Sequence, residues 1–142
     1  MKMEQAKLGG SCLCGAVSYE VAAPFTLMVH CHCSRCRKGT GTGHATNLIA
    51  PPTQFTWLTG EEALSHFDLP SAKSFSKWFC KQCGSPMPRL TRDGRRMVIP
   101  AGSLDSVPPI QPSDHIFWGS RAPWACESSG LPTHDEYPES WK

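Results

Sequence analysis

The sequence predicts a mainly β protein, one domain over residues 1–142 that is built from small antiparallel sheets and has little helix. Thirteen prolines and twelve glycines are scattered along the chain, a pattern that interrupts long helices and suits short strands joined by turns. Several short segments also alternate apolar and polar residues, as half-buried strands do. A length of 142 residues fits a single domain.

The strands are expected at short intervals. Residues 16–21 alternate apolar and polar, and residues 25–30 run into a cluster of cysteines. Residues 45–50 form the next strand and end at two prolines, whereas residues 55–58 end at Gly60. These breaks predict strands of four to six residues, each closed by a turn.

The second half of the chain continues this pattern. Residues 67–69 and 75–79 are expected to pair as a hairpin, and later strands are expected at 97–100 and 115–118. Asp93-Gly94 is a strong turn signal, so the nearby arginines are interpreted as part of a solvated hairpin. That group is Arg89, Arg92, Arg95 and Arg96. One helical turn is expected at 34–38, and a polar loop with a loose end from residue 125 onward.

Composition excludes several functional classes. The formal net charge of +2 is too small to indicate a nucleic-acid-binding face. No stretch approaches the roughly 18 apolar residues that span a membrane, and residues 1–10 lack the apolar core of a secretory signal. We therefore expect a cytoplasmic protein, in which clustered cysteines bind metal or do redox chemistry more often than they form disulfides.

The cysteines are the clearest functional signal. Cys12 and Cys14 form C-x-C, Cys80 and Cys83 form C-x-x-C, and Cys126 stands alone. The other three form C-x-C-x-x-C and are Cys31, Cys33 and Cys36. Thiolates at such spacings favour zinc, which binds four of them in tetrahedral geometry and has no redox chemistry. A redox role for the C-x-x-C pair is the alternative.

Two pairs far apart in the chain can build a closed four-thiolate site that clamps the N-terminal strand to a later hairpin. Because residues two apart on a strand share a face, Cys12 with Cys14 and Cys31 with Cys33 are expected to aim their sulfurs together. By the same geometry His32 points away from them. The three-cysteine cluster is structural if His30, His32 or Cys126 supplies a fourth ligand, and catalytic if that position stays open. The residues alone leave both possibilities open.

The remaining residues near the cysteines carry weaker signals. Arg35, Arg37 and Lys38 flank the three-cysteine cluster, where cations offset thiolate charge and can bind the carboxylates of a substrate. The other histidines are interpreted as structural. They are His44, His66, His115 and His134.

At these motifs the chain resembles the glutathione-dependent formaldehyde-activating enzyme family, which has an Mss4-like β-fold. The resemblance is carried by residues 10–17 (GSCLCGAV), 31–38 (CHCSRCRK) and 79–85 (FCKQCGS), with weaker likeness at 101–105 and 115–117. It spans about residues 10–132. It implies a small fold of antiparallel sheets pinned by zinc.

The resemblance also implies how the cysteines divide. Cys12, Cys14, Cys80 and Cys83 would hold a structural zinc. Cys31, Cys33 and Cys36 would hold a second, catalytic zinc, and Cys126 would have no counterpart. The implied activity is that of a carbon–sulfur lyase-type enzyme that joins the glutathione thiol to formaldehyde as S-hydroxymethylglutathione.

Our own hypothesis, independent of the family, is that Arg35, Arg37 and Lys38 bind the carboxylates of glutathione. The short chain leaves another thiol or another aldehyde open as the substrate. The alternative function is a non-enzymatic zinc-binding module with a structural or protein-interaction role.

Overall fold

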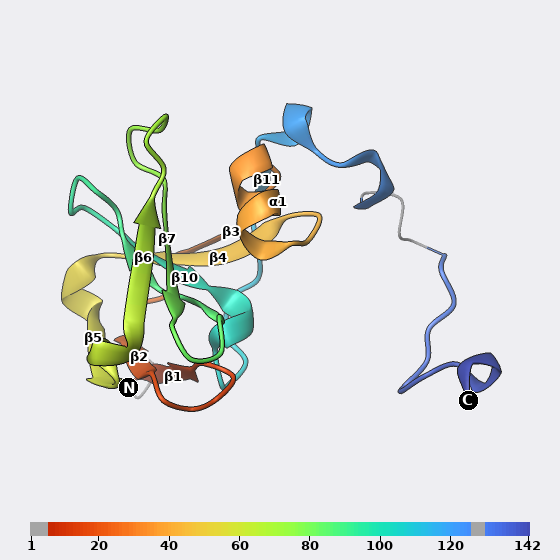
Figure 1. Ribbon diagram of the computed structural model, residues 1–142, viewed down its shortest axis with the longest axis horizontal. Coiled ribbons are helices and arrows are strands. Elements are labelled where there is room, and N and C mark those ends of the chain that lie inside the picture. The colour runs from red at the N-terminus through yellow and green to blue at the C-terminus, as the bar shows by residue number, and fades with distance from the viewer. Residues whose placement is uncertain (1–5, 126–129) are drawn as a thin grey trace.

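In the computed structural model, which describes residues 6–125 and 130–142, the chain folds into three small β-sheets (Figure 1). The first sheet has the order β1-β2-β5, with β1 at Lys7–Ser11, β2 at Ser18–Ala22 and β5 at Phe55–Thr59. The third has the order β6-β7-β8, with β6 at Leu64–Asp68, β7 at Ser76–Cys80 and β8 at Pro86–Met87.

The second sheet has five strands in the order β11-β3-β4-β10-β9. Its members are β3 (Leu27–Cys31), β4 (Ala45–Ala50), β9 (Arg89–Leu90), β10 (Met97–Pro100) and β11 (Asp114–Ile116). The prediction of a mainly β protein of small antiparallel sheets is confirmed, with one exception. Strand β11 lies parallel to β3, with His115 beside His30, because the long connection after β10 returns along the same sheet.

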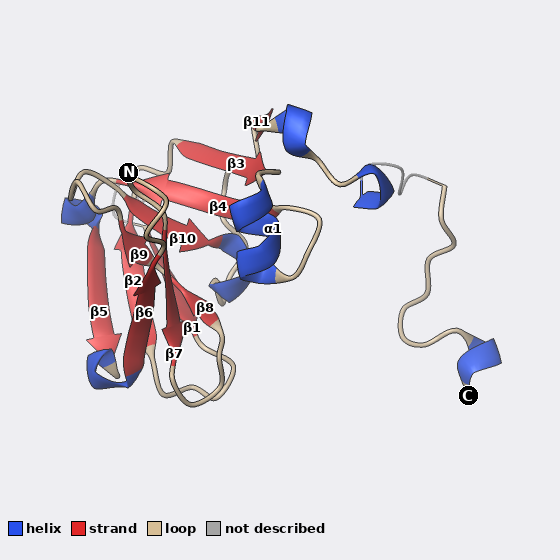
Figure 2. Cartoon of the chain, turned by 45° about the horizontal axis from the view of Figure 1, so that its top comes forward, coloured by secondary structure: helices blue, strands red, loops and turns tan. Residues whose placement is uncertain are grey.

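Helix is scarce, as predicted. The α-helix α1 covers Ser34–Thr40 and lies beside the ends of β3 and β4 (Figure 2). Gly41 ends the helix in the left-handed conformation, at φ 74°, and its amide donates to the Arg37 carbonyl. Single 3-10 turns occur at η2 (Pro52–Gln54), η3 (Glu61–Ala63), η4 (Ala101–Ser103), η5 (Trp118–Ser120), η6 (Pro123–Ala125) and η7 (Glu139–Trp141).

The expected strands at 16–21, 25–30, 45–50, 55–58, 67–69, 75–79, 97–100 and 115–118 all correspond to strands, with ends displaced by a few residues. The expected N-terminal strand was given no bounds, and it is β1, although Gly9-Gly10 disfavours a strand by propensity. The tertiary fold requires Gly10 there, since a Cβ at this position would overlap the buried Tyr19 ring. Packing thus overrides local preference at β1.

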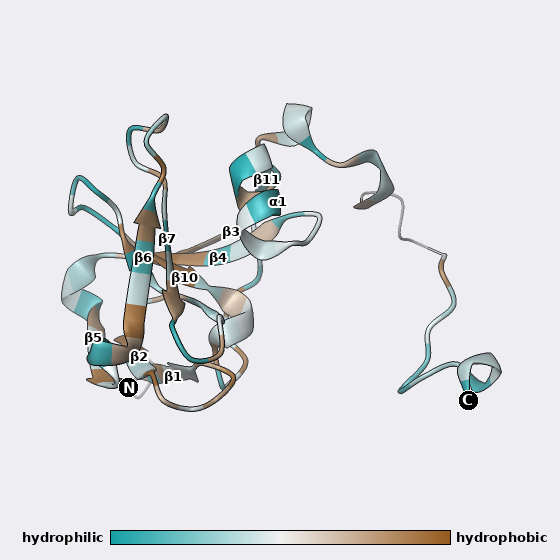
Figure 3. Ribbon diagram, in the orientation of Figure 1, coloured by the Kyte–Doolittle hydropathy of each residue, from teal (hydrophilic) through white to brown (hydrophobic). Residues whose placement is uncertain are grey.

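The main core lies between the first and second sheets. Its buried members are Leu8, Tyr19, Val21, Met28, Leu48, Ala50, Met97 and Ile99. Alternate residues of β1 and β2 are buried, as half-buried strands require. Figure 3 shows apolar colouring along β10 and hydrophilic colouring on much of α1. A second cluster contains two cysteines, Cys12 and Cys80, packed with Val17, Ala63 and Met87.

Residues 130–142 extend away from the sheets (Figure 1). The expected polar loop from residue 125 falls partly on residues 126–129, which lie outside the described part of the chain. Among the described residues, no helix has the length and apolar character needed to cross a membrane.

Candidate metal centres and the adjoining cleft

The first candidate centre joins two loops from different sheets. The sulfurs of Cys12, Cys14, Cys80 and Cys83 all lie within 4.8 Å of one another. The Sγ atoms of Cys12 and Cys14 are 3.6 Å apart, and those of Cys14 and Cys80 are 3.8 Å apart. Four sulfurs grouped this closely, all free thiols, fit a tetrahedral zinc.

Two glycine turns fold the backbone around these sulfurs. Gly15 and Gly84 both adopt left-handed conformations, at φ 83° and 77°, where residues with a side chain are strained. The Gly84 amide donates to the Cys80 carbonyl at 2.8 Å, which closes the C-x-x-C turn. The Val17 amide also donates to the Cys12 sulfur at 3.3 Å. Such bonds stabilise thiolates and orient them toward a metal.

The second candidate centre lies at the junction of β3 and α1. The sulfurs of Cys31, Cys33 and Cys36 lie within 4.8 Å of one another. Cys31 is the buried last residue of β3, and Cys33 is the N-cap of α1. The Cys33 sulfur accepts a hydrogen bond from the Cys36 amide at 3.3 Å. A strand end and a helix start therefore aim three sulfurs at one point.

Both C-x-C motifs converge by a different local geometry from the predicted one. Cys12 and Cys14 were expected to share the face of a strand, but they lie in the turn after β1. Cys33 likewise follows the end of β3. The sulfurs still meet, because the backbone folds around them as it does in a C-x-x-C turn.

Hydrogen bonds within each cluster shift the pKa values of the thiols. The hydrogen bond from the Cys36 thiol lowers the pKa of Cys31 to about 6, and the same bond raises the pKa of Cys36 far above its ordinary value. In the first centre, the Ser85 hydroxyl lowers the pKa of Cys83 to about 5. Each cluster therefore holds thiolate character at neutral pH, which is the form that binds metal.

The two histidines considered as a fourth ligand do not join the three-cysteine cluster within the described chain. His30 bonds through Nδ1 to the Thr46 hydroxyl at 2.7 Å, and His32 Nε2 lies 2.8 Å from Nδ1 of His115. Cys126, the third candidate, lies outside the described residues.

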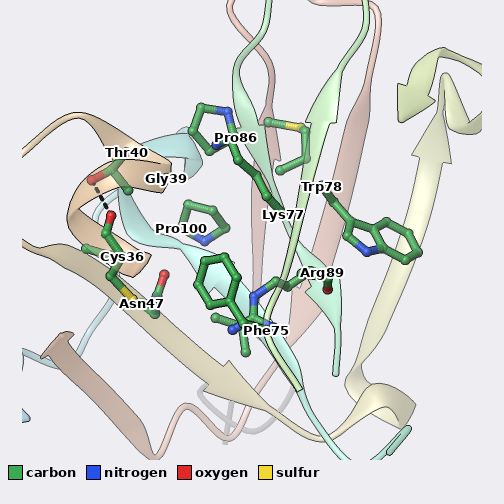
Figure 4. Close-up of a pocket in the computed structure, with 14 residues that line it drawn as sticks. Cys36, Gly39, Thr40, Asn47, Phe75, Lys77, Trp78, Pro86, Arg89 and Pro100 are labelled. Carbon is green, nitrogen blue, oxygen red and sulfur yellow. Dashed lines mark hydrogen bonds between the residues drawn. The ribbon is translucent and has the colours of Figure 1, made fainter. Parts of the chain in front are cut away.

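A cavity of about 530 Å³ adjoins the three sulfurs. That volume is ordinary for a small-molecule site and large enough for a tripeptide. Its walls come from β3, β4, β9, β10, the end of β11, the start of α1 and the loop between β6 and β7. The residues that bear on the chemistry are Cys31, Cys33, Cys36, Arg35, Asn47, Lys73, Phe75 and Arg89. A second, smaller pocket, of about 60 Å³, shares Cys36, Asn47, Phe75 and Arg89 with this cavity (Figure 4).

The three cations predicted to contact a substrate occupy different positions. Arg35 lines the cavity. Arg37 and Lys38 are not among the lining residues; Arg37 is partly buried, with its Nε buried and unpaired within the described chain, and Lys38 is exposed. Their role in carboxylate binding stays a prediction.

Arg89 is a site residue that sequence reasoning missed. It was assigned to a solvated hairpin, but its guanidinium lies partly buried at the cavity wall, 5.1 Å from the centre of the Phe75 ring. Burial lowers the pKa of Arg89, and electrostatic interactions with the thiols of Cys36, Cys31 and Cys33 oppose that shift. Arg92, Arg95 and Arg96 are exposed, as the solvated interpretation requires.

Nothing local to the sequence distinguishes these arginines. All four lie within eight residues of one another around one turn. Strand β9 holds Arg89 beside β10 and turns it inward, so only the tertiary fold reveals its position. Arg92 is exposed, and its guanidinium donates to the Ala72 carbonyl at 2.6 Å.

Comparison with known proteins identifies the family. The model of the family described as "Glutathione-dependent formaldehyde-activating enzyme" matches residues 7–120. The chain belongs to this family. A Halomonas elongata protein named "Putative glutathione-dependent formaldehyde-activating enzyme" is 31% identical over 124 residues, which cover 82% of this chain and 78% of that protein.

A solved structure has a similar fold. A crystal structure of a Rhodobacter sphaeroides protein superposes with a TM-score of 0.60 at 26% sequence identity, covering 75% of this chain and 98% of the other. The family match includes both cysteine clusters.

Proposed function

We propose that this protein forms or cleaves a thiol–aldehyde adduct, such as S-hydroxymethylglutathione, as a zinc-dependent carbon–sulfur lyase-type enzyme. The observation that carries the proposal is the opening of three convergent sulfurs, Cys31, Cys33 and Cys36, onto a cavity that would hold a small peptide thiol. Membership of the family supports the choice of glutathione and formaldehyde as the first substrates to test.

Two zinc ions per chain fit the donor sets. Cys12, Cys14, Cys80 and Cys83 would hold a structural zinc, because four thiolates complete its tetrahedral coordination. Cys31, Cys33 and Cys36 would hold the second. A zinc ion bound there supplies Lewis acidity that favours the thiolate form of a substrate thiol.

The chain's own groups then position the reaction. Three protein thiolates and Zn²⁺ sum to a charge of −1, which the cations at the cavity wall offset. In the forward direction the substrate sulfur forms a bond to the aldehyde carbon, the carbonyl π bond breaks, and the oxygen takes a proton. The half-enclosed cavity holds the two reactants together, and this proximity is the main rate advantage expected over the spontaneous reaction.

Metal analysis together with an adduct-exchange measurement tests the proposal. We expect two zinc ions per chain and faster exchange between formaldehyde and S-hydroxymethylglutathione, measured by NMR, than buffer gives. Cys36→Ser should lose one zinc and the rate enhancement, whereas Ser34→Ala, an exposed neighbour, should keep both. Two zinc ions without any rate enhancement for several thiols and aldehydes would overturn the enzymatic proposal and favour a zinc-binding module.

A further inference from the structure

We propose that Arg89 selects the thiol substrate by charge, its guanidinium receiving a carboxylate of the thiol whose sulfur binds at Cys31, Cys33 and Cys36. This inference rests on the proposed function. It names a specificity-determining residue outside the basic segment that flanks the three cysteines, and it defines the substrate class as thiols that carry a carboxylate.

The position of Arg89 is the first argument. The same cavity is lined by the three cysteines and by Arg89 and Phe75. The Arg89 guanidinium lies over the Phe75 ring, 5.1 Å from its centre, and Figure 4 shows the two side chains beside each other in a smaller pocket that Cys36 also lines. A ligand whose sulfur lies at the cysteines therefore shares its cavity with Arg89.

The free hydrogen-bonding capacity of Arg89 is the second argument. A guanidinium has five N–H donors arranged to grip a carboxylate through two parallel bonds. Within the described chain, Arg89 makes one long bond, from a terminal nitrogen to the Ser74 carbonyl at 3.4 Å, and pairs with no carboxylate. Arg92, by contrast, is engaged with the Ala72 carbonyl and lies 4.0 Å from Asp68.

The charge of the cavity is the third argument. Its lining includes the cations Arg35, Lys73 and Arg89, and the described lining residues include no Asp or Glu. A partly buried arginine without a carboxylate partner loses hydration that only an anion restores well. The protein thiolates supply part of the negative charge that Arg89 needs. A ligand carboxylate would also offer two oxygen atoms that accept parallel hydrogen bonds from the guanidinium, which a sulfur atom cannot do.

Contact with Phe75 restricts the Arg89 side chain. The guanidinium carbon lies over the Phe75 ring, 5.1 Å from its centre, within the range of a cation–π contact, and a restricted side chain loses less entropy when a carboxylate binds. A lysine at position 89 would keep the positive charge, but it would lack the planar group that contacts Phe75 and the two parallel hydrogen bonds to a carboxylate. If Arg89 only offsets the negative charge of the thiolates, lysine should replace it without loss. If Arg89 binds a ligand carboxylate, lysine should not.

A binding comparison separates these roles. The probes are glutathione and its diamide, in which neutral amides of nearly the same shape replace both carboxylates. Dissociation constants are measured from the absorption spectrum of the cobalt(II)-loaded protein, which reports a thiolate that reaches the metal, for the wild type, Arg89→Gln and Arg89→Lys. Arg95→Gln is the matched control, because Arg95 is exposed on the same hairpin.

We expect the wild type to bind glutathione about 10- to 100-fold more tightly than the diamide, the range for a buried charge-assisted hydrogen bond. Arg89→Gln should lose most of this preference, because it should bind glutathione more weakly and the diamide as tightly as the wild type does. Arg89→Lys should lose a large part of it, and Arg95→Gln should keep it.

Equal wild-type affinity for the two probes would overturn the inference while leaving the proposed function intact. The inference is also overturned if Arg89→Gln keeps the full preference for glutathione over the diamide, because another group would then bind the carboxylate. If Arg89→Gln fails to hold cobalt, the wild-type preference and Arg89→Lys decide the question. Absence of any thiol-dependent change in the wild-type spectrum would instead refute the proposed function, and this inference with it.

Discussion

Replacement of Cys80 by serine should destabilise the whole fold, whereas replacement of Cys36 should not. Cys80 is fully buried and lies at the meeting point of β7, the turn before β8 and the loop after β1. A zinc bound there connects segments that are far apart in the chain: Cys14 and Cys80 are separated by 66 residues. Cys36 lies in a short motif with Cys31 and Cys33, so a metal bound there closes no long loop.

The loop length gives the magnitude. Treated like a disulfide, a cross-link that closes a loop of this size removes about 4 kcal/mol of chain entropy from the unfolded state. A domain of this size has roughly 5–15 kcal/mol of stability in total. With a urea dependence of about 2 kcal/mol per molar, Cys80→Ser should lower the unfolding midpoint by about 2 M urea.

The assay is urea unfolding followed by tryptophan fluorescence, with zinc content measured on the same samples. Cys80→Ser should lose one zinc and unfold at much lower urea. Cys36→Ser should also lose one zinc, yet unfold within about 0.5 M of the wild type. A Cys80→Ser protein with wild-type zinc content and midpoint would refute the structural assignment of the first centre.

Two further predictions concern the core and the turns. Burial raises the pKa of Tyr19 to about 12, so its stabilising contribution should be complete below pH 10 and disappear as the pH rises toward 12. Tyr19→Phe should remove this alkaline loss and, because the Tyr19 hydroxyl lies 2.6 Å from the Ser103 hydroxyl, should cost about 1 kcal/mol at pH 7 in urea unfolding. The same alkaline slope in both proteins would contradict the assignment. Gly60 and Gly94 both have positive φ, at 80° and 75°, but only a Cβ at Gly60 would overlap backbone atoms, those of Ala16 and Val17. Gly94→Ala should therefore cost about 1 kcal/mol and Gly60→Ala several times more in thermal unfolding, and similar losses would show that the close approach is unimportant.

Local patterns in the sequence were sufficient for much of the fold. Alternation at residues 16–21 and the breaks at Pro51 and Gly60 located strands, because half-burial and turn geometry act over a few residues. The bounds of β1 could not be predicted in this way, since Gly10 is required by the packing of the Tyr19 ring and does not favour a strand by propensity. The parallel pairing of β11 with β3 also depends on contacts more than eighty residues apart in the chain.

The cysteine spacings by themselves determined that this chain has two pairs and one triplet of thiols suited to zinc, because a ligand motif is short enough to be complete in the sequence. Only the tertiary structure decided which sulfurs converge, since Cys12 and Cys80 meet through the packing of separate sheets. It also decided which arginine faces the triplet. Arg89 and Arg95 are alike in sequence, and a two-residue strand places one in the cavity and leaves the other in solvent.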